Sequence, residues 1–301
     1  MLTRSLRADF FMLLTAAIWG TAFVAQRAGM EFVGPFTFNA VRFALGAISL
    51  VPFLFIKTGE KAPEPSVGLI KIILSGLIAG TVLFLGSSLQ QVGIVYTTAG
   101  NAGFITGLYV ILVPIMGLFF RQKPGIGVWI GAVLAVAGLY FINETRGLNL
   151  SKGDFLVLIC AFFFAAHVLL IGWLSPRNPV VPLSIAQFTV CSLWSFAAAI
   201  RQEVILLPGI MDAAIPILYG GIGSVGIAYT LQVIGQKDAP PGHAAIILSL
   251  ESVFALLGGW LLLSEHVSSF KLLGCALMLI GMLSAQIQRF WLNGKKQTPK
   301  D

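Results

Sequence analysis

The sequence predicts an all-α membrane protein with ten transmembrane helices, arranged as two inverted repeats of five helices each. Three observations support this fold. The composition is strongly apolar, ten segments are long enough to cross a bilayer, and the first half of the 301-residue chain is repeated in the second half. Because five crossings leave the chain on the opposite side of the membrane, the second repeat must lie upside down relative to the first.

The composition excludes a water-soluble core. Hydrophobic residues make up 57% of the chain and charged residues only 10%, and the mean hydropathy is +0.92, which leaves too little polar surface for a soluble protein of this size. A helix needs about 20 mostly apolar residues to cross the hydrocarbon. Such segments lie at 10–29, 36–56, 69–91, 98–120, 125–143, 154–174, 183–200, 213–235, 243–263 and 269–290.

Glycine and proline mark most of the joints between these segments, as at Gly34-Pro35. The polar stretch Asn143–Gly153 separates the two halves. We therefore expect a first five-helix repeat over residues 1–147 and a second over residues 148–301, which ends in a short basic tail. Pro114 is expected to bend the fourth helix, because proline removes a backbone hydrogen bond; its partner in the second repeat is Leu256.

The repeat can be followed position by position. Early positions match at an offset of 145, as in Asp9 with Asp154 and Arg42 with Gln187. Later positions match at an offset of 142, and the last helix of each half carries two glycines seven positions apart. The matched positions in these later parts are Gln90 with Gln232, Asn101 with His243, Tyr109 with Glu251, Gly131 with Gly274, and Gly138 with Gly281.

The basic residues predict that both termini are cytoplasmic. With this orientation, thirteen of the 19 Lys and Arg residues lie on the inner side, five lie on the outer side and Arg42 lies within a helix, as the positive-inside rule requires. The net charge of +7 therefore reflects orientation and anionic lipid headgroups, not binding of nucleic acid. The first apolar segment imitates a signal peptide, but its counterpart at 154–174 cannot be one, so we expect it to remain as the first helix.

Glu251 is the most informative single residue. It lies about eight positions into the ninth predicted helix, roughly 12 Å along its axis and so near the middle of the bilayer. An ionised carboxylate at this depth costs on the order of 3 kcal/mol, so it is expected to face a cavity or a partner. Three roles are open: proton coupling, binding of a substrate amine, or a structural hydrogen bond between helices.

Other polar residues within the helices are candidates for the same cavity. An inverted repeat places matched positions around a shared centre, which favours Tyr109, Asn101, Gln90 and Gln232, although both glutamines could equally form interhelical hydrogen bonds.

Arg42, His167 and Trp19 complete the candidate residues. Arg42 would either bind a substrate carboxylate or extend to the outer interface. His167 is either a proton relay or a packing residue, and Trp19 either lines the cavity or packs between helices.

Several chemistries have no motif in this sequence. It contains no His-Glu-x-x-His, no Cys-x-x-Cys, no P-loop and no Gly-x-Ser-x-Gly nucleophile elbow. Its three cysteines lie in apolar segments without the spacing of metal ligands. We therefore expect no enzyme, no cofactor and no metal site, and energy for any pumping would come from a gradient.

Three stretches resemble the repeated EamA-type domains of the drug/metabolite transporter superfamily: Ile18–Phe23, Ala99–Phe104 and Leu250–Ala255. The resemblance covers nearly the whole chain, from about 8 to 290. It implies ten helices around a central cavity, alternating access, and transport of small metabolites, often amino acids and often outward, in the bacterial inner membrane. The family glutamate of the ninth helix falls on Glu251, whereas the proline that often follows it is replaced by Ser252.

We therefore expect a secondary transporter for a small polar or amphipathic metabolite, with proton coupling through Glu251. The alternative is a membrane sensor or scaffold that keeps the transporter fold without transporting. An intramembrane enzyme would need a nucleophile and a base, and His167 with Glu251 is the only pair that merits a test. The expected partners are the substrate and the lipid bilayer, and the oligomeric state is left open. The expected substrate-binding residues are Glu251, Tyr109, Gln90, Gln232, Asn101, Arg42, Trp19 and His167.

Overall fold

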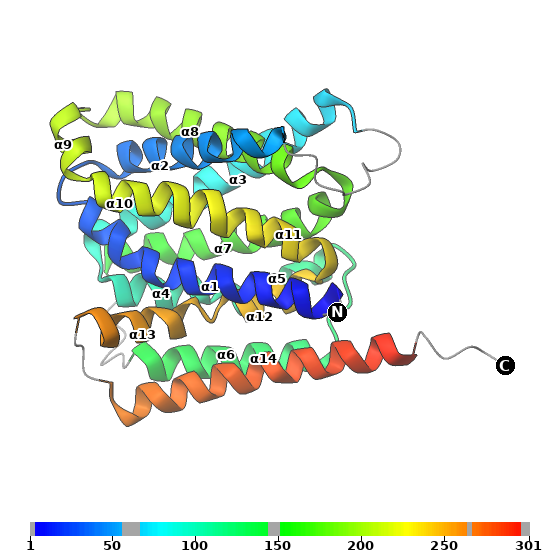
Figure 1. The fold of residues 1–301 in the computed structure, drawn as a ribbon. Coiled ribbons are helices and arrows are strands. Elements are labelled where there is room, and N and C mark those ends of the chain that lie inside the picture. The colour runs from blue at the N-terminus through cyan, green and yellow to red at the C-terminus, as the bar shows by residue number, and fades with distance from the viewer. Residues whose placement is uncertain (1–3, 56–66, 144–150, 264–266, 296–301) are drawn as a thin grey trace.

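The computed structural model describes residues 4–55, 67–143, 151–263 and 267–295, and all regular structure in these ranges is helical. The long helices run side by side along one axis, so that α1 begins and α14 ends at the same end of the bundle (Figure 1). We call this the terminal end. The other end, where α1 finishes, is called the opposite end.

The helices follow the order that the sequence predicts. The first half contains α1 (Arg4–Gly29), α2 (Pro35–Leu50), the 3₁₀ turn η1 (Val51–Leu54), α3 (Leu69–Tyr96), α4 (Ala99–Gly107), α5 (Tyr109–Phe119) and α6 (Ile126–Asn143). The second half contains α7 (Lys152–Leu174), the 3₁₀ turn η2 (Ser175–Arg177), α8 (Val180–Gln202), α9 (Leu207–Asp212), α10 (Ala214–Leu218), the π-helix η3 (Tyr219–Tyr229), α11 (Thr230–Asp238), α12 (Pro241–Leu248), α13 (Glu251–Leu263) and α14 (Ser269–Lys295).

The structure confirms an all-helical chain of the membrane type. Among the described residues, seven helical stretches are long and apolar enough to cross a membrane, and three more apolar helices are shorter. Large apolar side chains such as Phe10, Ile48 and Phe119 are exposed on the outside, whereas polar ones such as Gln187 and Glu251 are buried. This distribution is the reverse of that in soluble proteins and suits a lipid-facing surface.

Two of the predicted spans are broken at matched positions. The fourth span divides at Leu108 into α4 and α5, and the ninth divides at Ser249 and Leu250 into α12 and α13. At each break one backbone N–H turns to the carbonyl three residues before it, from Leu108 to Ile105 and from Leu250 to Ile247. Pro114 was expected to bend the fourth span, but it lies inside α5, and the break comes six residues earlier.

The π-helix η3 holds one residue more than the matching part of α3. A β-carbon added at Gly80 of α3 would meet the carbonyl oxygen of Gln187, and one at Gly221 of η3 would meet that of Arg42, the repeat partner of Gln187. The offset between these two glycines is 141, whereas Gln90 and Gln232 lie 142 apart. A wider π turn takes up such an inserted residue without ending the helix.

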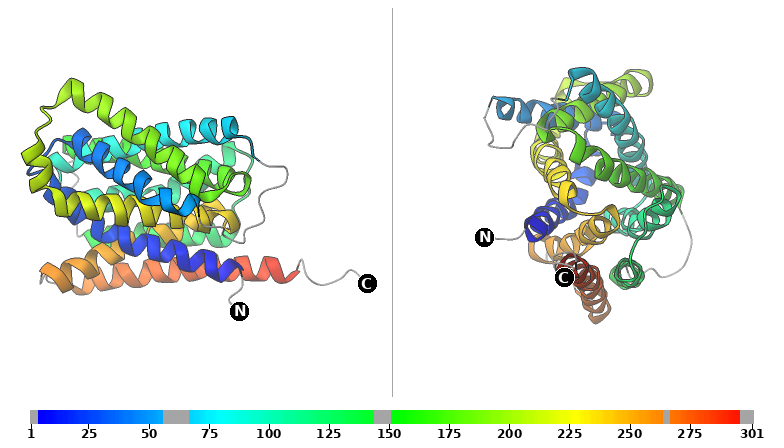
Figure 2. Two further views of the ribbon diagram at one scale, coloured as in Figure 1. Left: turned by 45° about the horizontal axis from the view of Figure 1, so that its top comes forward. Right: turned by 90° about the vertical axis from the view of Figure 1, so that its right-hand side faces the viewer.

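Helices α6 and α14 pair with each other at one edge of the bundle (Figure 2). Glycines bring the two backbones into close contact. A β-carbon at Gly138 would lie 2.5 Å from the carbonyl oxygen of Gly274, and one at Gly131 would lie 2.7 Å from that of Gly281. Lipid supplies little hydrophobic drive between helices, so this close approach of small residues holds the pair together.

This packing predicts that Gly138→Ala destabilises the protein. The added methyl group would lie too close to a backbone oxygen that cannot turn away, and overpacking of this kind costs about 1–3 kcal/mol. Thermal unfolding in detergent should show a melting temperature lower by several degrees. Gly103→Ala is the matched control, because its nearest neighbour would be Phe23 at 3.6 Å. Equal melting temperatures for the two variants would contradict this account of the α6–α14 contact.

Candidate functional site

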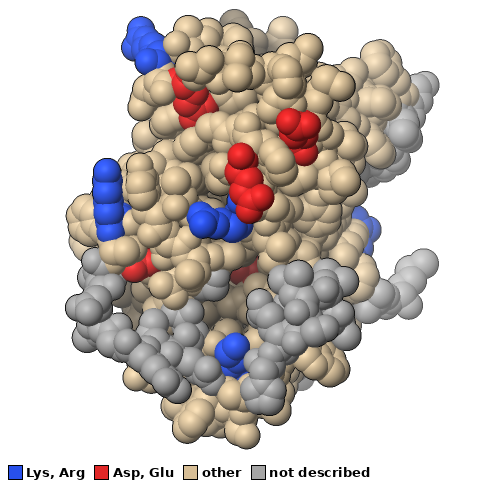
Figure 3. All heavy atoms as spheres, turned by 90° about the vertical axis from the view of Figure 1, so that its left-hand side faces the viewer, with Lys and Arg blue, Asp and Glu red and all other residues tan. Residues whose placement is uncertain are grey.

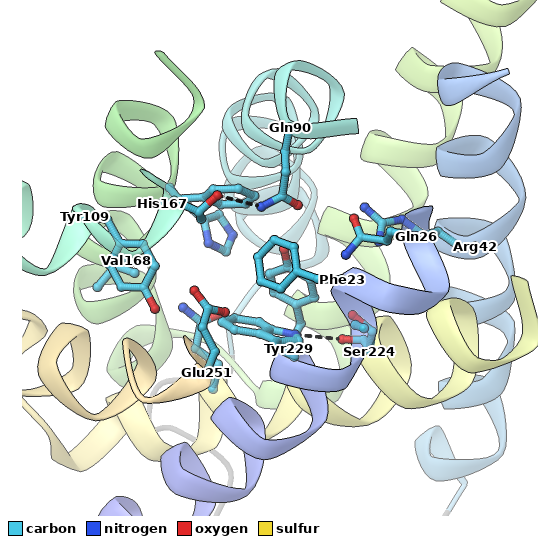
Figure 4. Close-up of a pocket in the computed structure, with 15 residues that line it drawn as sticks. Phe23, Gln26, Arg42, Gln90, Tyr109, His167, Val168, Ser224, Tyr229 and Glu251 are labelled. Atoms are coloured by element: carbon cyan, nitrogen blue, oxygen red, sulfur yellow. Dashed lines mark hydrogen bonds between the residues drawn. The ribbon is translucent and has the colours of Figure 1, made fainter. Parts of the chain in front are cut away.

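A cavity lies between the two halves of the chain, and most of the helices around it contribute side chains (Figure 4). It is narrow, with a volume of about 40 Å³, which is room for a few water molecules. A metabolite would therefore require the helices around it to move apart. The side chains that line it are Trp19, Ala22, Phe23, Gln26, Arg42, Gln90, Thr106, Tyr109, Phe164, His167, Val168, Ser224, Tyr229, Gln232 and Glu251.

The cavity brings together seven of the eight residues that the sequence proposed for substrate binding. They come from six segments that are distant in the chain: α1, α2, α3, α5, α7 and the α11–α13 region. The seven residues are Trp19, Arg42, Gln90, Tyr109, His167, Gln232 and Glu251.

Glu251 enters the cavity from the first position of α13, directly after the break in the ninth span. Its side chain is 3% exposed, and its Oε1 has no hydrogen-bond partner among the described residues. Tyr109, its repeat partner, begins α5 after the matching break and points its hydroxyl towards the carboxylate (Figure 4). The break places the positive N-terminal end of α13 beside this carboxyl group.

Arg42 lies on the other side of the cavity from Glu251 (Figure 4). It is 2% exposed, its Nε donates to Asn39 Oδ1 at 2.9 Å, and the rings of Phe38 and Phe43 lie 5.5 and 5.0 Å from its guanidinium. No carboxylate of the described residues lies within ion-pair distance of Arg42. A buried guanidinium without a counter-ion is costly, so this side chain is suited to an anionic group that enters the cavity.

Aromatic rings form one wall of the cavity. Trp19 packs on Tyr229 with ring centroids 4.6 Å apart, and its Nε1 donates to the carbonyl oxygen of Ser224 at 3.1 Å. Thr15 also donates to the backbone of η3, to Ala228 O at 3.0 Å. These contacts fix α1 against the π-helix and hold a flat apolar surface between the two charged groups.

Of the remaining polar candidates, His167 and Gln90 form hydrogen bonds with neighbouring side chains, whereas one atom of Gln232 does not. His167 Nε2 lies 3.0 Å from Gln187 Oε1, and this contact, not one with Glu251, holds its ring among the described residues. Gln90 donates to Thr106 Oγ1 at 3.1 Å. Gln232 Oε1 has no partner among the described residues and is therefore available to a donor inside the cavity.

Asn101 lies elsewhere. It belongs to a shallow pocket at the opposite end of the bundle, where α1 and α3 finish and α4 and α7 begin. Asp154 in this pocket accepts hydrogen bonds from Thr97 Oγ1 at 2.6 Å and from the backbone of Ser151 at 2.9 Å. Figure 3 looks onto this end, where acidic and basic side chains lie close together. This pocket is open to the outside and shares no lining residue with the cavity that holds Glu251.

Eight lining residues were not among the sequence candidates; six of them lie three, four or seven positions from a candidate in the same span, and a seventh, Val168, lies four positions after the lining residue Phe164. Helical spacing places such residues on one face, so the pattern around Trp19, Tyr109, His167 and Gln232 could have found them. They are Ala22, Phe23, Gln26, Thr106, Phe164, Val168 and Tyr229. The eighth, Ser224, lies five positions before Tyr229, the spacing of the π-helix.

Comparison with known proteins agrees with this arrangement. The EamA-like transporter family matches the chain twice, over residues 6–144 and 151–285. An uncharacterized transporter of Archaeoglobus fulgidus is 31% identical over 290 residues, which cover 95% of this chain and 87% of the relative. An uncharacterized transporter of Synechocystis is 26% identical over 334 residues, which cover 99% and 97% of the two chains.

A solved crystal structure supports the fold. It superposes with a TM-score of 0.77 at 19% identity and covers 95% of this chain and 98% of the other. The similarity at this level of identity concerns the fold alone. With two matches to the family that together span most of the sequence, the chain belongs to the EamA-like transporter family.

Proposed function

We propose that this membrane transporter is a secondary transporter for a small polar or amphipathic metabolite that carries both a carboxylate and an ammonium group, such as an amino acid or a related compound. It would work by alternating access, as an exporter in a bacterial inner membrane, with both termini in the cytoplasm. The observation that carries the proposal is the pair of buried charges, Arg42 and Glu251, on two sides of one cavity.

Repeat-matched contacts support two inverted five-helix repeats with ten crossings. Gly131 matches Gly274 in the sequence, and Gly138 matches Gly281. If each glycine is replaced by its match, the contact of Gly138 with Gly274 becomes the contact of Gly281 with Gly131, which the structure also contains. A β-carbon at Gly93 would lie 3.0 Å from Gly153 O, and the matching one at Gly235 would lie 3.0 Å from Ala8 O. Helix pairs follow the same rule, since α3 packs on α7 as α11 packs on α1. The two family matches, over 6–144 and 151–285, also divide the chain in this way.

The charges indicate the chemistry of the substrate. A carboxylate of the solute would pair with the guanidinium of Arg42, and an ammonium group would pair with Glu251. Each pairing would give a buried ionisable group the oppositely charged partner that it lacks among the described residues. The indole of Trp19 and the ring of Tyr229 would contact the apolar part of the same molecule.

The broken spans and the size of the cavity favour alternating access. Discontinuous helices that meet at a central site are typical of transporters built from inverted repeats. Leu108 and Leu250 supply two such breaks at matched positions. Because the cavity holds only a few water molecules in this conformation, rearrangement of the helices would accompany binding. A sensor or scaffold would need no cavity with unpaired opposite charges, so this site favours transport.

Glu251 also offers a route for proton coupling. One carboxylate cannot hold a proton and an ammonium group at once, so binding of one would release the other. An exchanger built on this competition exports the amine against entry of a proton. Direction and coupling rest on this argument and on the family resemblance.

The variant Glu251→Gln tests coupling. In proteoliposomes with a panel of amino acids and related compounds, the wild type is expected to exchange substrate across the membrane and to accumulate it when a pH gradient is imposed. The amide cannot carry the proton, so gradient-driven accumulation should be lost and apparent affinity should fall by about 10–100-fold, the effect of losing one charged hydrogen bond. Glu31→Gln, at an exposed position, is the control. Gradient-driven accumulation by a folded Glu251→Gln protein would contradict coupling through this residue.

The variant Arg42→Gln tests recognition of the carboxylate. It is expected to raise the concentration of substrate needed for half-maximal transport by about 10–100-fold, since it removes a charged hydrogen-bond donor from the cavity. Esters that lack the carboxylate should be transported equally by the wild type and the variant. Arg201→Gln, at the exposed end of α8, should leave transport unchanged. If Arg42→Gln discriminates against esters as strongly as the wild type, Arg42 does not bind the carboxylate.

A further inference from the structure

One polar pair lies outside the cavity and joins two helices that line or approach it. His243 Nε2 of α12 lies 2.9 Å from Asp9 Oδ1 of α1. Both side chains are buried, with 2% and 7% of their surface exposed. Because α1 begins at the terminal end, Asp9 lies near that end of the bundle (Figure 1). Neither residue lines the cavity.

Apolar side chains fill the space between this pair and the cavity. A buried cluster joins Ala8 and Met12 of α1 to residues of α5, α7 and α12. Tyr109 and Val168 belong both to this cluster and to the cavity wall, so the cluster continues directly from the floor of the cavity. It separates the cavity from the terminal end of the bundle.

The repeat produces a second cluster at the opposite end. Several of its residues are repeat partners of residues in the first cluster, as with Ala102 for Ala244 and Ile105 for Ile247. Asp154 takes the place of Asp9, and its partners are Thr97 and Ser151. The two ends therefore carry equivalent seals, each made of an aspartate at the start of a helix and an apolar cluster behind it.

The two seals are not equally tight. Every residue of α12 from Gly242 to Leu248 is buried, whereas Asn101, the sequence partner of His243, is partly exposed and lines the shallow pocket at the opposite end. The apolar cluster at the terminal end is also the larger of the two. In this conformation the terminal end is the more firmly closed.

We propose that the Asp9–His243 pair is a latch that closes the cavity at the terminal end. It ties α12, the first half of the broken ninth span, to α1. The cavity can open on that side only when α12 leaves α1, and this movement breaks the hydrogen bond. The contacts of Asp154 with Thr97 and Ser151, which are also formed in this conformation, are the matching contacts at the opposite end. This inference rests on the proposed alternating access, but it concerns a contact that takes no part in substrate binding.

Cysteine reactivity tests the latch without a substrate. Single reporters Ala244→Cys and Ala102→Cys, which are repeat partners and fully buried, are placed in a protein whose Cys160, Cys191 and Cys275 are replaced by Ala. Asp9→Ala is expected to raise the rate of maleimide labelling at the first reporter by about tenfold, the effect of losing one charged hydrogen bond. The rate at the second reporter should not rise. Asp154→Ala, the matched control, should show the reverse pattern.

A double exchange, Asp9→His with His243→Asp, guards against a misfolded single variant. The exchange restores one aspartate and one histidine at this contact. The labelling rate at the Ala244→Cys reporter should then fall towards the rate measured in the protein that keeps Asp9 and His243. Unchanged labelling in Asp9→Ala, an equal rise at both reporters, or no return in the exchanged pair would overturn the latch. The result does not depend on transport, so failure of the latch and failure of counterflow are distinguishable.

Discussion

A charge that is buried away from water needs a partner, and this requirement governs the centre of the protein. Arg42 and Glu251 are each almost completely buried, and among the described residues neither has an oppositely charged partner. An unpaired ion in such a position costs several kcal/mol, so two ionisable groups of opposite sign on one cavity are suited to bind a solute there. A solute that carries both a carboxylate and an ammonium group would supply the missing partners. The cavity is then a recognition site that is complete only when it is occupied.

The rest of the fold holds these charges apart. The break before Glu251 places its side chain and the first turn of α13 at the cavity. The π-helix η3 places Tyr229 and the carbonyl oxygen of Ser224 against Trp19. Glycine contacts between α6 and α14 tie the two halves together at the edge of the bundle, away from the centre. These glycine contacts are alike in the two halves, whereas Arg42 and Glu251 have the uncharged sequence partners Gln187 and Tyr109.

The apolar helices and the polar side chains within them could be predicted from sequence, because each leaves a local pattern. Seven of the eight candidate residues chosen from these patterns line one cavity. Asn101 was expected in the same cavity as Glu251, but it is the third residue of α4, close to the opposite end of the bundle, and lines the pocket there. Packing between helices determines the π turn and the breaks at Leu108 and Leu250. No local sequence motif therefore predicts them. Helical spacing from Trp19 and His167 would have extended the site further.

Ligand-induced stabilisation of the purified protein tests the central claim most directly. The melting temperature is measured with one metabolite in three forms: the intact zwitterion, its ester without the carboxylate, and its N-acyl derivative without the ammonium group. The account predicts that the zwitterion raises the melting temperature most, by an amount that corresponds to about 2.7 kcal/mol at a hundredfold excess over its dissociation constant, and that the two modified forms at the same concentration raise it much less. Equal stabilisation by all three forms would show that neither Arg42 nor Glu251 recognises a charge on the solute.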